Sequence, residues 1–341
     1  MKGERRGALA DWLADRTGAS YCAVTSTRGL AGGAIQENWL LELDMQGGAL
    51  SGQTELVLRT DSPSNVVQSL GRAQEFTLLK VAHGAGMTVP EPLFLDSEGT
   101  VIGKPFFVMR RAGGTANPRE LTRDRRLDPR RTDLAEQVGR EIAKLHRIEP
   151  PHPDLPFLAE APTSPATNRV ESFLEQLDGL PDPLPILEWG SRWLDRNAPE
   201  TERVTLCHGD YRTGNIMVED ANITGVLDWE FASWSDPMED IGWLCARCWR
   251  FGADAREAGG LGDRLDLYRG YEAETGSMVD WSTVAYWEIM ATARWAIIAH
   301  HQGLRHISGA QSSMELALTG RKAAEMEFDV LTQIRAIEDG A

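Results

Sequence analysis

The chain is short of cysteine and histidine for its length. Its 341 residues include 4 Cys and 7 His, which disfavours both a disulfide scaffold and a metal site built from several Cys and His ligands. One CxxC spacing occurs, from Cys245 to Cys248 in a Trp-rich segment, but no second pair completes a zinc site. We therefore expect these cysteines to be structural residues of a buried helix.

Long apolar runs and positive net charge are also missing. No stretch approaches the roughly 18 apolar residues of a membrane span, and the N-terminus has no continuous apolar segment of the secretory type. The net charge of −16 argues against nucleic acid as a partner. We expect a cytoplasmic protein with neither nucleic acid nor membrane as a partner.

The composition is that of a globular protein, with 42% hydrophobic and 25% charged residues and no internal repeat. The first part is predicted to be rich in β-structure, with strands over 37–45, 54–60 and within 104–114, and one helix over 65–86. The remainder is predicted to be mainly helical, over 132–148 and roughly 236–251, 262–275, 280–303 and 312–337. This order predicts an α+β fold of two lobes, residues 1–110 and 111–341.

Three polar residues beside short apolar runs carry the strongest chemical signal. In LCHGDYRTGNIMVEDANITGVLDWEFA, residues 206–232, Asp210, Asn215 and Asp228 adjoin two predicted buried strands. A hairpin through 219–222 brings Asp228 back beside Asn215, and the two oxygen ligands suit Mg²⁺ with phosphate oxygens completing its shell. Asp210 is then placed to accept a proton from a hydroxyl, as in nucleotide-dependent phosphoryl transfer. A cluster that only caps turns is the alternative.

The ordered pair HGDYRTGN and VLDWE resembles the aminoglycoside phosphotransferase/choline kinase family, whose members are relatives of the protein kinases. The resemblance extends over nearly the whole chain. Residues 30–43 resemble the family's nucleotide loop, 235–244 the segment after the metal-binding Asp, and 294–309 a subgroup of uncharacterised bacterial phosphotransferases. It implies a protein-kinase-like fold with a small β-rich nucleotide-binding N-lobe and a larger, mainly helical catalytic and substrate C-lobe. It also implies ATP as co-substrate and Mg²⁺ as the metal.

The resemblance assigns roles to individual residues. Asp210 is expected to be the catalytic base, Asn215 and Asp228 the Mg²⁺ ligands, and Asp240 and His208 structural supports of the catalytic loop. The expected cofactor-binding residues are Arg59, Glu75, Gly32, Gly33 and Asn38. Arg59 stands where the family has a phosphate-binding lysine, and the two residue types are not interchangeable at a geometric site. An active enzyme and a nucleotide-binding pseudokinase both remain open on this point.

The acceptor is expected to be a hydroxyl of a small molecule, because no long activation segment follows Asp228. Trp287, Arg294 and His301 recur every seven residues, and Arg305 follows. This helix face suits an anionic acceptor, unless Arg294 merely covers a core stripe. An arginine cluster fits the same idea or a solvated loop: Arg119, Arg123, Arg125, Arg126, Arg130 and Arg131.

We therefore predict an ATP-dependent phosphotransferase for a hydroxy acid or a hydroxyacyl-CoA. An aminoglycoside or a choline-like aminoalcohol is the alternative acceptor. A metal-dependent hydrolase is disfavoured, since such sites usually include His ligands.

Overall fold

The computed structural model describes residues 3–30, 36–61 and 70–340, which form two compact units. The first unit comprises Met1–Gly114, Pro153–Phe157 and Thr224–Phe231, and the second comprises Thr115–His152, Leu158–Ile223 and Ala232–Ala341. Asp228 thus belongs to the first unit, while Asp210 and Asn215 belong to the second. The division of functions between residues 1–110 and 111–341 stays a prediction.

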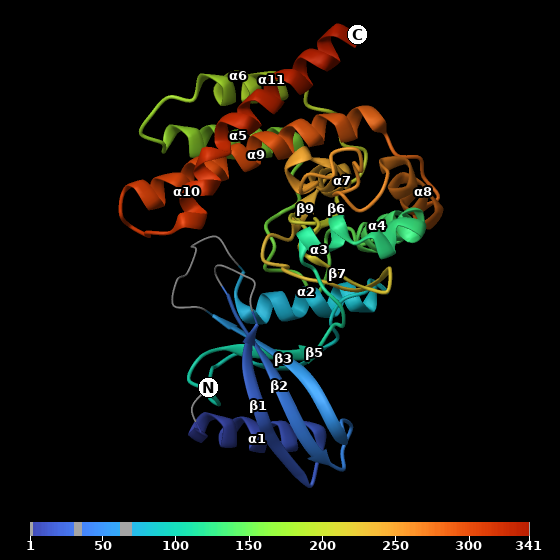
Figure 1. Cartoon of the computed structure of the whole chain (residues 1–341), viewed down its shortest axis with the longest axis vertical. Coiled ribbons are helices and arrows are strands. Elements are labelled where there is room, and N and C mark those ends of the chain that lie inside the picture. The colour runs from blue at the N-terminus through green and yellow to red at the C-terminus, as the bar shows by residue number, and fades with distance from the viewer. Residues whose placement is uncertain (1–2, 31–35, 62–69, 341) are drawn as a thin grey trace. The chain divides into compact units, whose positions relative to one another are not determined.

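The first unit is built on a five-stranded antiparallel sheet in the order β1-β2-β3-β5-β4. Its strands are β1 (Tyr21–Leu30), β2 (Gln36–Gln46), β3 (Gly52–Asp61), β4 (Pro92–Asp96) and β5 (Phe106–Arg110). Leu41, Leu43 and Met45 alternate along β2 and are buried with Leu9 and Leu13 of α1 (Gly3–Thr17), as expected for a half-buried strand. Figure 1 shows α1 running along the sheet. The predicted strands 37–45 and 54–60 are confirmed.

The helix α2 (Arg72–Gly84) completes the first unit. It is shorter than the predicted helix over 65–86, and residues 65–69 lie outside the described part of the chain. Gly71 at its N-cap has an extended backbone, and the side chain of Gln74 accepts from the Gly71 amide at 2.9 Å. The helix begins there because this contact satisfies an amide before the first turn.

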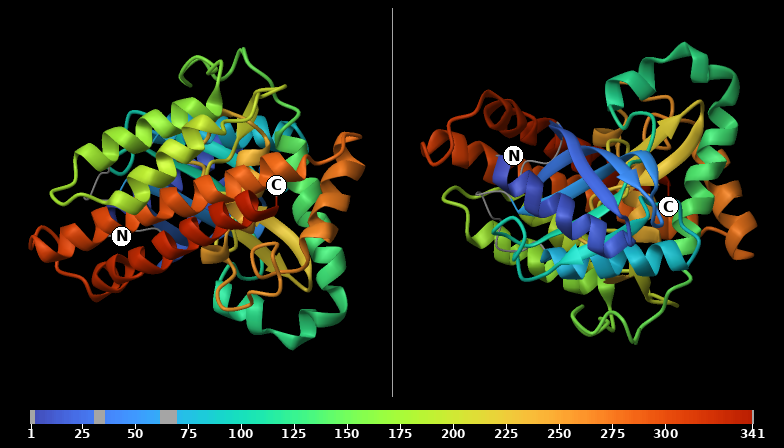
Figure 2. Two further views of the ribbon diagram at one scale, coloured as in Figure 1. Left: turned by 90° about the horizontal axis from the view of Figure 1, so that it is seen from above. Right: turned by 90° about the horizontal axis from the view of Figure 1, so that it is seen from below.

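The second unit is mainly helical. In its described residues the helices are α3 (Pro118–Arg123), α4 (Arg131–Leu145), α5 (Pro165–Asp178), α6 (Pro185–Arg196), α7 (Met238–Cys245), α8 (Arg264–Thr275), α9 (Trp281–Ile307), α10 (Met314–Arg321) and α11 (Ala323–Gly340), with 3₁₀ turns η1 (Arg125–Arg130) and η2 (Arg247–Trp249). The long helix α9 contacts α5, α6, α7, α10 and α11. Figure 2 shows α10 and α11, in red, beside the orange α9. No helix in the described ranges is long and apolar enough to cross a membrane.

Two short strand pairs carry the polar motif. Strand β6 (Thr205–Cys207) pairs with β9 (Ser233–Ser235), and β7 (Ile216–Glu219) pairs with β8 (Asn222–Val226). The predicted hairpin through 219–222 is confirmed. Its turn places Asp220 and Ala221 at φ 48° and 61°, in the left-handed region that two-residue hairpin turns use.

Several predicted helix limits were wrong. The helix predicted over 236–251 ends at Cys245, because Ala246 is extended and the Cys245 carbonyl accepts from Arg250 instead of from the next helical turn. The helix predicted over 312–337 is divided at Lys322 into α10 and α11. Helices α5 and α6 were not predicted, although Ser164 caps the start of α5 in the usual way.

Candidate active site

The loop between β6 and β7, residues 208–215, holds the candidate base in an irregular backbone. Gly209 and Gly214 have φ values of 75° and 116°, a region that glycine enters without steric cost. Tyr211 donates to the carbonyl of Val138 at 2.8 Å, and Thr213 donates to the carbonyl of Gly259 at 2.6 Å. The loop is therefore tied at two points to the body of the second unit.

The carboxylate of Asp210 is oriented by three side-chain donors. Trp243 Nε1 and Arg212 Nε each donate to Asp210 Oδ1 at 2.9 Å, and Asn215 Nδ2 donates to Asp210 Oδ2 at 2.6 Å. The guanidinium of Arg212 also lies 4.4 Å from the ring centre of Trp249. Because charged acceptors make strong hydrogen bonds, these donors hold the carboxylate in one direction.

Asp240 braces the backbone of this loop from beneath. Its two carboxylate oxygens accept from the amides of His208 at 2.7 Å and Gly209 at 2.9 Å, and His146 Nε2 lies 3.2 Å from Asp240 Oδ2. Burial acts to raise the pKa of Asp240, but the contacts with His146 and His208 outweigh it, so the pKa lies below its usual value. His208 is itself fully buried, and its Nδ1 accepts from the amide of Asp210 at 3.2 Å.

Arg294 holds the same loop from α9. Its guanidinium donates to the carbonyl of Gly209 at 2.9 Å and lies 4.4 Å from the ring centre of Trp243. Trp243 is the residue that donates to Asp210, so Arg294 contacts the loop both directly and through that indole. The sequence suggested Arg294 as a substrate contact, whereas the structure places it on the protein's own backbone.

The other residues predicted to contact the acceptor lie in different surroundings. Trp287 is only 1% exposed and packs edge-on against Tyr286. It is therefore a residue of the core. His301 is half-buried, and Arg305 is exposed and donates to Gln311. The face predicted from the seven-residue spacing is thus divided between core and surface.

In the first unit, Arg59 on β3 lies between two carboxylates. Its Nε is 2.8 Å from Glu75 Oε1, and one terminal nitrogen is 3.0 Å from Asp228 Oδ1. The other terminal nitrogen donates to Asn38 Oδ1 at 3.4 Å. Burial acts to lower the pKa of Arg59, but Glu75 and Asp228 outweigh it and raise the pKa. Arg59 is therefore charged at every ordinary pH.

Arg72 shares the carboxylate of Glu75. Its NH1 group is paired with Glu75 Oε2, and its Nε is 2.9 Å from Asp61 Oδ1. Arg59, Arg72 and Glu75 are all at most 4% exposed. A buried charge is costly unless it is paired, and here each guanidinium has an acid. Gly32 and Gly33, the predicted phosphate-loop glycines, lie outside the described residues.

Asn215 and Asp228 each have an oxygen that fits a hard cation. Asn215 uses its amide nitrogen on Asp210, which leaves the amide oxygen for another partner. Asp228 is 30% exposed at its side chain, and its Oδ1 contacts Arg59. Asp228 also has φ 63°, an unusual conformation for a residue other than glycine. A carboxylate and an amide oxygen are ligands that Mg²⁺ accepts.

Comparison with known proteins identifies the family. The model described as "Phosphotransferase enzyme family" matches residues 26–275. The chain belongs to this family. The prediction from the sequence that this chain is a phosphotransferase is therefore confirmed. The predicted α+β, kinase-like fold is confirmed as well.

Solved structures with a similar fold include aminoglycoside phosphotransferases and a protein of the choline/ethanolamine kinase family. A candidate aminoglycoside phosphotransferase from Ralstonia eutropha has a TM-score of 0.74 and 20% identity, over 97% of this chain and 98% of that one. The GDP and kanamycin complex of APH(2")-IIia has a TM-score of 0.62 and 17% identity, over 90% and 94%. A choline/ethanolamine kinase family protein from Mesorhizobium loti has a TM-score of 0.57 and 17% identity, over 91% and 89%.

Curated relatives of the phosphotransferase are much longer proteins. Acyl-CoA dehydrogenase family member 10 of Mus musculus is 28% identical over 200 residues, which are 56% of this chain and 18% of the relative. Acyl-CoA dehydrogenase family member 11 of Homo sapiens is 26% identical over 190 residues, 54% of this chain and 24% of the relative. The match thus spans about a fifth of the length of these relatives.

Sequence reasoning missed several supports of this site. Trp243, Arg212 and His146 were not assigned to Asp210 or Asp240. Arg212 stands two residues from Asp210, so its proximity was available from the sequence. Trp243 and His146 are 33 and 94 residues from their partners, and a separation of that size leaves no local signal.

Proposed function

We propose that this phosphotransferase moves the γ-phosphoryl group of Mg·ATP to a hydroxyl of a small anionic molecule, a hydroxy acid or a hydroxyacyl-CoA. The observation that carries the proposal is the carboxylate of Asp210, which Trp243, Arg212 and Asn215 hold by hydrogen bonds in a loop braced by Asp240. A structural turn cap has no use for a carboxylate oriented from three sides.

Asp210 is assigned the role of base. It accepts the proton of the acceptor hydroxyl while the acceptor oxygen bonds to the γ-phosphorus and the bond from that phosphorus to the bridging oxygen breaks, releasing ADP. Positioning and charge neutralisation provide most of the rate in such transfers. The fixed direction of the Asp210 carboxylate supports this assignment, because a base must lie within hydrogen-bond reach of the proton that it takes.

Asn215 and Asp228 are assigned to hold Mg²⁺, which when bound neutralises phosphate charge. The amide oxygen of Asn215 and the carboxylate of Asp228 are hard ligands of the type that this ion prefers. Arg59, with Asn38 beside it, is assigned to the phosphates of the nucleotide, and Glu75 positions the Arg59 guanidinium. These assignments support an active enzyme over a pseudokinase, since a module that only binds has no need of the oriented base.

The anionic acceptor is supported by the matched relatives, which carry the name acyl-CoA dehydrogenase family members 10 and 11. The alternative, an aminoglycoside, is supported by the fold shared with a kanamycin complex. At 17% identity that likeness concerns the fold. The acceptor class is therefore decided by assay.

The test is a panel assay with isosteric variants. The protein is incubated with Mg·ATP and 3-hydroxybutyrate, 3-hydroxybutyryl-CoA, kanamycin or choline, and mass spectrometry detects a phosphorylated acceptor. Asp210→Asn is expected to lower kcat by at least about 10²-fold, the lower end for general-base help, with KM for ATP unchanged. Asp220→Asn is the matched control, because Asp220 is exposed in the β7–β8 turn.

Two results would overturn the proposal. Undiminished turnover in Asp210→Asn would show that Asp210 is not the base. Turnover of kanamycin or choline alone would show that the acceptor is not an anion. ATP binding without phosphate transfer to any acceptor would favour the pseudokinase.

A further inference from the structure

A cavity of about 340 Å³ lies within the second unit, apart from the residues described so far. Its walls come from α3, from η2 and the segment after it, from α9, and from the junction of α10 and α11. Ligand pockets usually measure about 300–1,000 Å³. The cavity is therefore large enough for a small molecule or for one end of a longer one.

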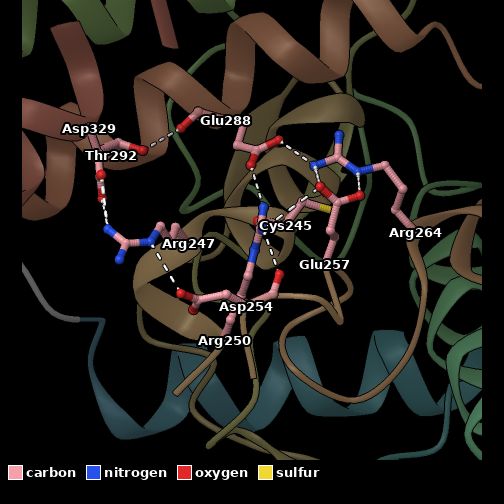
Figure 3. A network of polar contacts seen from close by, with 9 residues as sticks. All are labelled: Cys245, Arg247, Arg250, Asp254, Glu257, Arg264, Glu288, Thr292 and Asp329. Carbon is pink, nitrogen blue, oxygen red and sulfur yellow. Dashed lines mark hydrogen bonds and ion pairs between the residues drawn. The ribbon is translucent and has the colours of Figure 1, made fainter. Parts of the chain in front are cut away.

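The acids that line this cavity are already engaged. Arg247 lies 2.9 Å from Asp329 Oδ1, 3.3 Å from Glu325 Oε1 and 3.6 Å from Asp254 Oδ2. Figure 3 shows Arg247 between Asp329 and Asp254. These acids together raise the pKa of Arg247, most of all through the hydrogen bond that Arg247 donates to Asp329. One guanidinium thus occupies three carboxylates, and an amine ligand would have to compete with it.

The remaining cations of the cavity have no such partners. Arg119 and Arg123 lie four residues apart on α3, and Lys322 is the C-cap of α10. Within the described ranges, none of these three side chains makes a hydrogen bond or an ion pair. The cavity lining therefore carries four cations against three acids, in a chain whose net charge is −16. A local positive field in an acidic protein favours an anion.

An aromatic cluster joins the cavity to the candidate base. Trp295 lines the cavity and lies 4.8 Å from Trp249, measured between ring centres, and Trp249 lies 5.2 Å from Trp243. Trp243 donates to Asp210, and Arg212 contacts both Trp249 and Asp210. The cavity wall and the base thus belong to one packed group of side chains within the same unit.

Buried ion pairs fix the wall that carries Arg247 and Asp254. Arg250, 9% exposed, donates to the Cys245 carbonyl and to Glu288 of α9, both at 2.8 Å. Arg264 donates to Glu288 at 3.0 Å and to Glu257 at 2.7 Å. Figure 3 shows this network beside Arg247. Because its members hold the segment after η2 against α9, the cavity is preorganised, which reduces the entropy lost on binding.

We propose that this cavity is the acceptor site of the phosphotransferase, with Arg119, Arg123 and Lys322 binding the anionic group of the acceptor and Trp295 and Phe251 covering its carbon chain. The assignment rests on the proposed function, whose acceptor class it explains. The anionic group is a carboxylate in a free hydroxy acid and a phosphate in a hydroxyacyl thioester of coenzyme A. Both have the oxygen acceptors that guanidinium groups bind.

Charge reversal on α3 tests the proposal. Arg123→Glu is compared with Arg125→Glu, which makes the same change on an exposed neighbour that does not line the cavity. With 3-hydroxybutyrate and with 3-hydroxybutyryl-CoA, Arg123→Glu is expected to raise the acceptor KM at least tenfold and to leave KM for ATP unchanged. Arg125→Glu is expected to stay within twofold of wild type. Turnover of only one probe identifies the carboxylate or the phosphate as the bound group.

Equal acceptor KM values in the two variants would overturn the assignment. The unchanged KM for ATP shows that the variant is folded.

Direct binding separates this proposal from the proposed function. Coenzyme A and 3-hydroxybutyrate are titrated by calorimetry into wild type, Arg123→Glu and Arg125→Glu without nucleotide. Binding that only Arg123→Glu loses supports the cavity even if wild type phosphorylates neither hydroxyl probe. No binding to wild type, or equal binding to both variants, contradicts it.

Discussion

At the scale of single residues, the site depends on charges that have partners from more than one element. Arg59 contacts Glu75 of α2 and Asp228 after β8, and Glu75 also contacts Arg72. A lysine at position 59 would carry a single point charge, whereas the arginine guanidinium presents several N–H donors in a planar fork. The arginine therefore makes two contacts at once.

Replacement of Arg59 separates charge from geometry. Arg59→Ala leaves Glu75 with Arg72 alone in a buried position, so we expect a loss of about 3 kcal/mol in the free energy of unfolding, the lower end for a broken buried pair. Arg59→Lys is expected to lose less stability and yet to raise KM for ATP, because the side chain reaches one carboxylate at a time. Urea unfolding and steady-state kinetics measure both effects. An Arg59→Lys variant with an improved KM would show that the fork is not needed.

At the scale of elements, the second unit relies on a close contact between α4 and α8. A Cβ added to Gly139 would lie 2.0 Å from the carbonyl oxygen of Leu267, and one added to Gly270 would lie 2.0 Å from that of Glu136. The contact matters for the site because His146 is the C-cap of α4. His146 lies 3.1 Å from the hydroxyl of Tyr271 on α8 and also contacts Asp240.

The contact predicts opposite effects for one substitution made in two helices. Gly139→Ala is expected to lower the free energy of unfolding by about 1–3 kcal/mol, because the added carbon overpacks the contact. This loss outweighs the better helix propensity of alanine. Gly7→Ala in α1 has nothing within 4 Å of the added carbon, so we expect a gain of about 0.5–1 kcal/mol. Thermal unfolding of both variants provides the measurement. Stabilisation by Gly139→Ala would contradict the close helix contact.

At the scale of the whole molecule, ligand binding is expected to appear as added stability. A ligand that binds only the folded state at 100 times its Kd adds about 2.7 kcal/mol. We expect ATP with Mg²⁺ to raise Tm, EDTA to reverse most of that rise, and Asp228→Ala to lose the part that depends on Mg²⁺. Differential scanning fluorimetry with and without EDTA gives the values. A full Mg²⁺-dependent rise in Asp228→Ala would remove that residue from the metal site.

Much of the fold followed from local pattern. The alternation along 37–45 predicted β2, and the turn residues after Val218 predicted the β7–β8 hairpin. The long amphipathic segment 132–148 predicted α4. The boundary at Cys245 did not follow, because the Arg250 guanidinium that binds the Cys245 carbonyl is itself held by Glu288 of α9, 38 residues away. The break at Lys322 was not predicted either.

The sequence by itself determined the family, because Asp210, Asn215 and the glycines around them lie within one short loop whose pattern is local. Only the tertiary structure decided which side chains support that loop. It placed Arg294 on the Gly209 carbonyl, 85 residues away, and it placed Arg123, but not Arg125, in the cavity wall. Helical spacing gives the face of a residue on its own helix, whereas the neighbour of that face is set by how distant segments pack together.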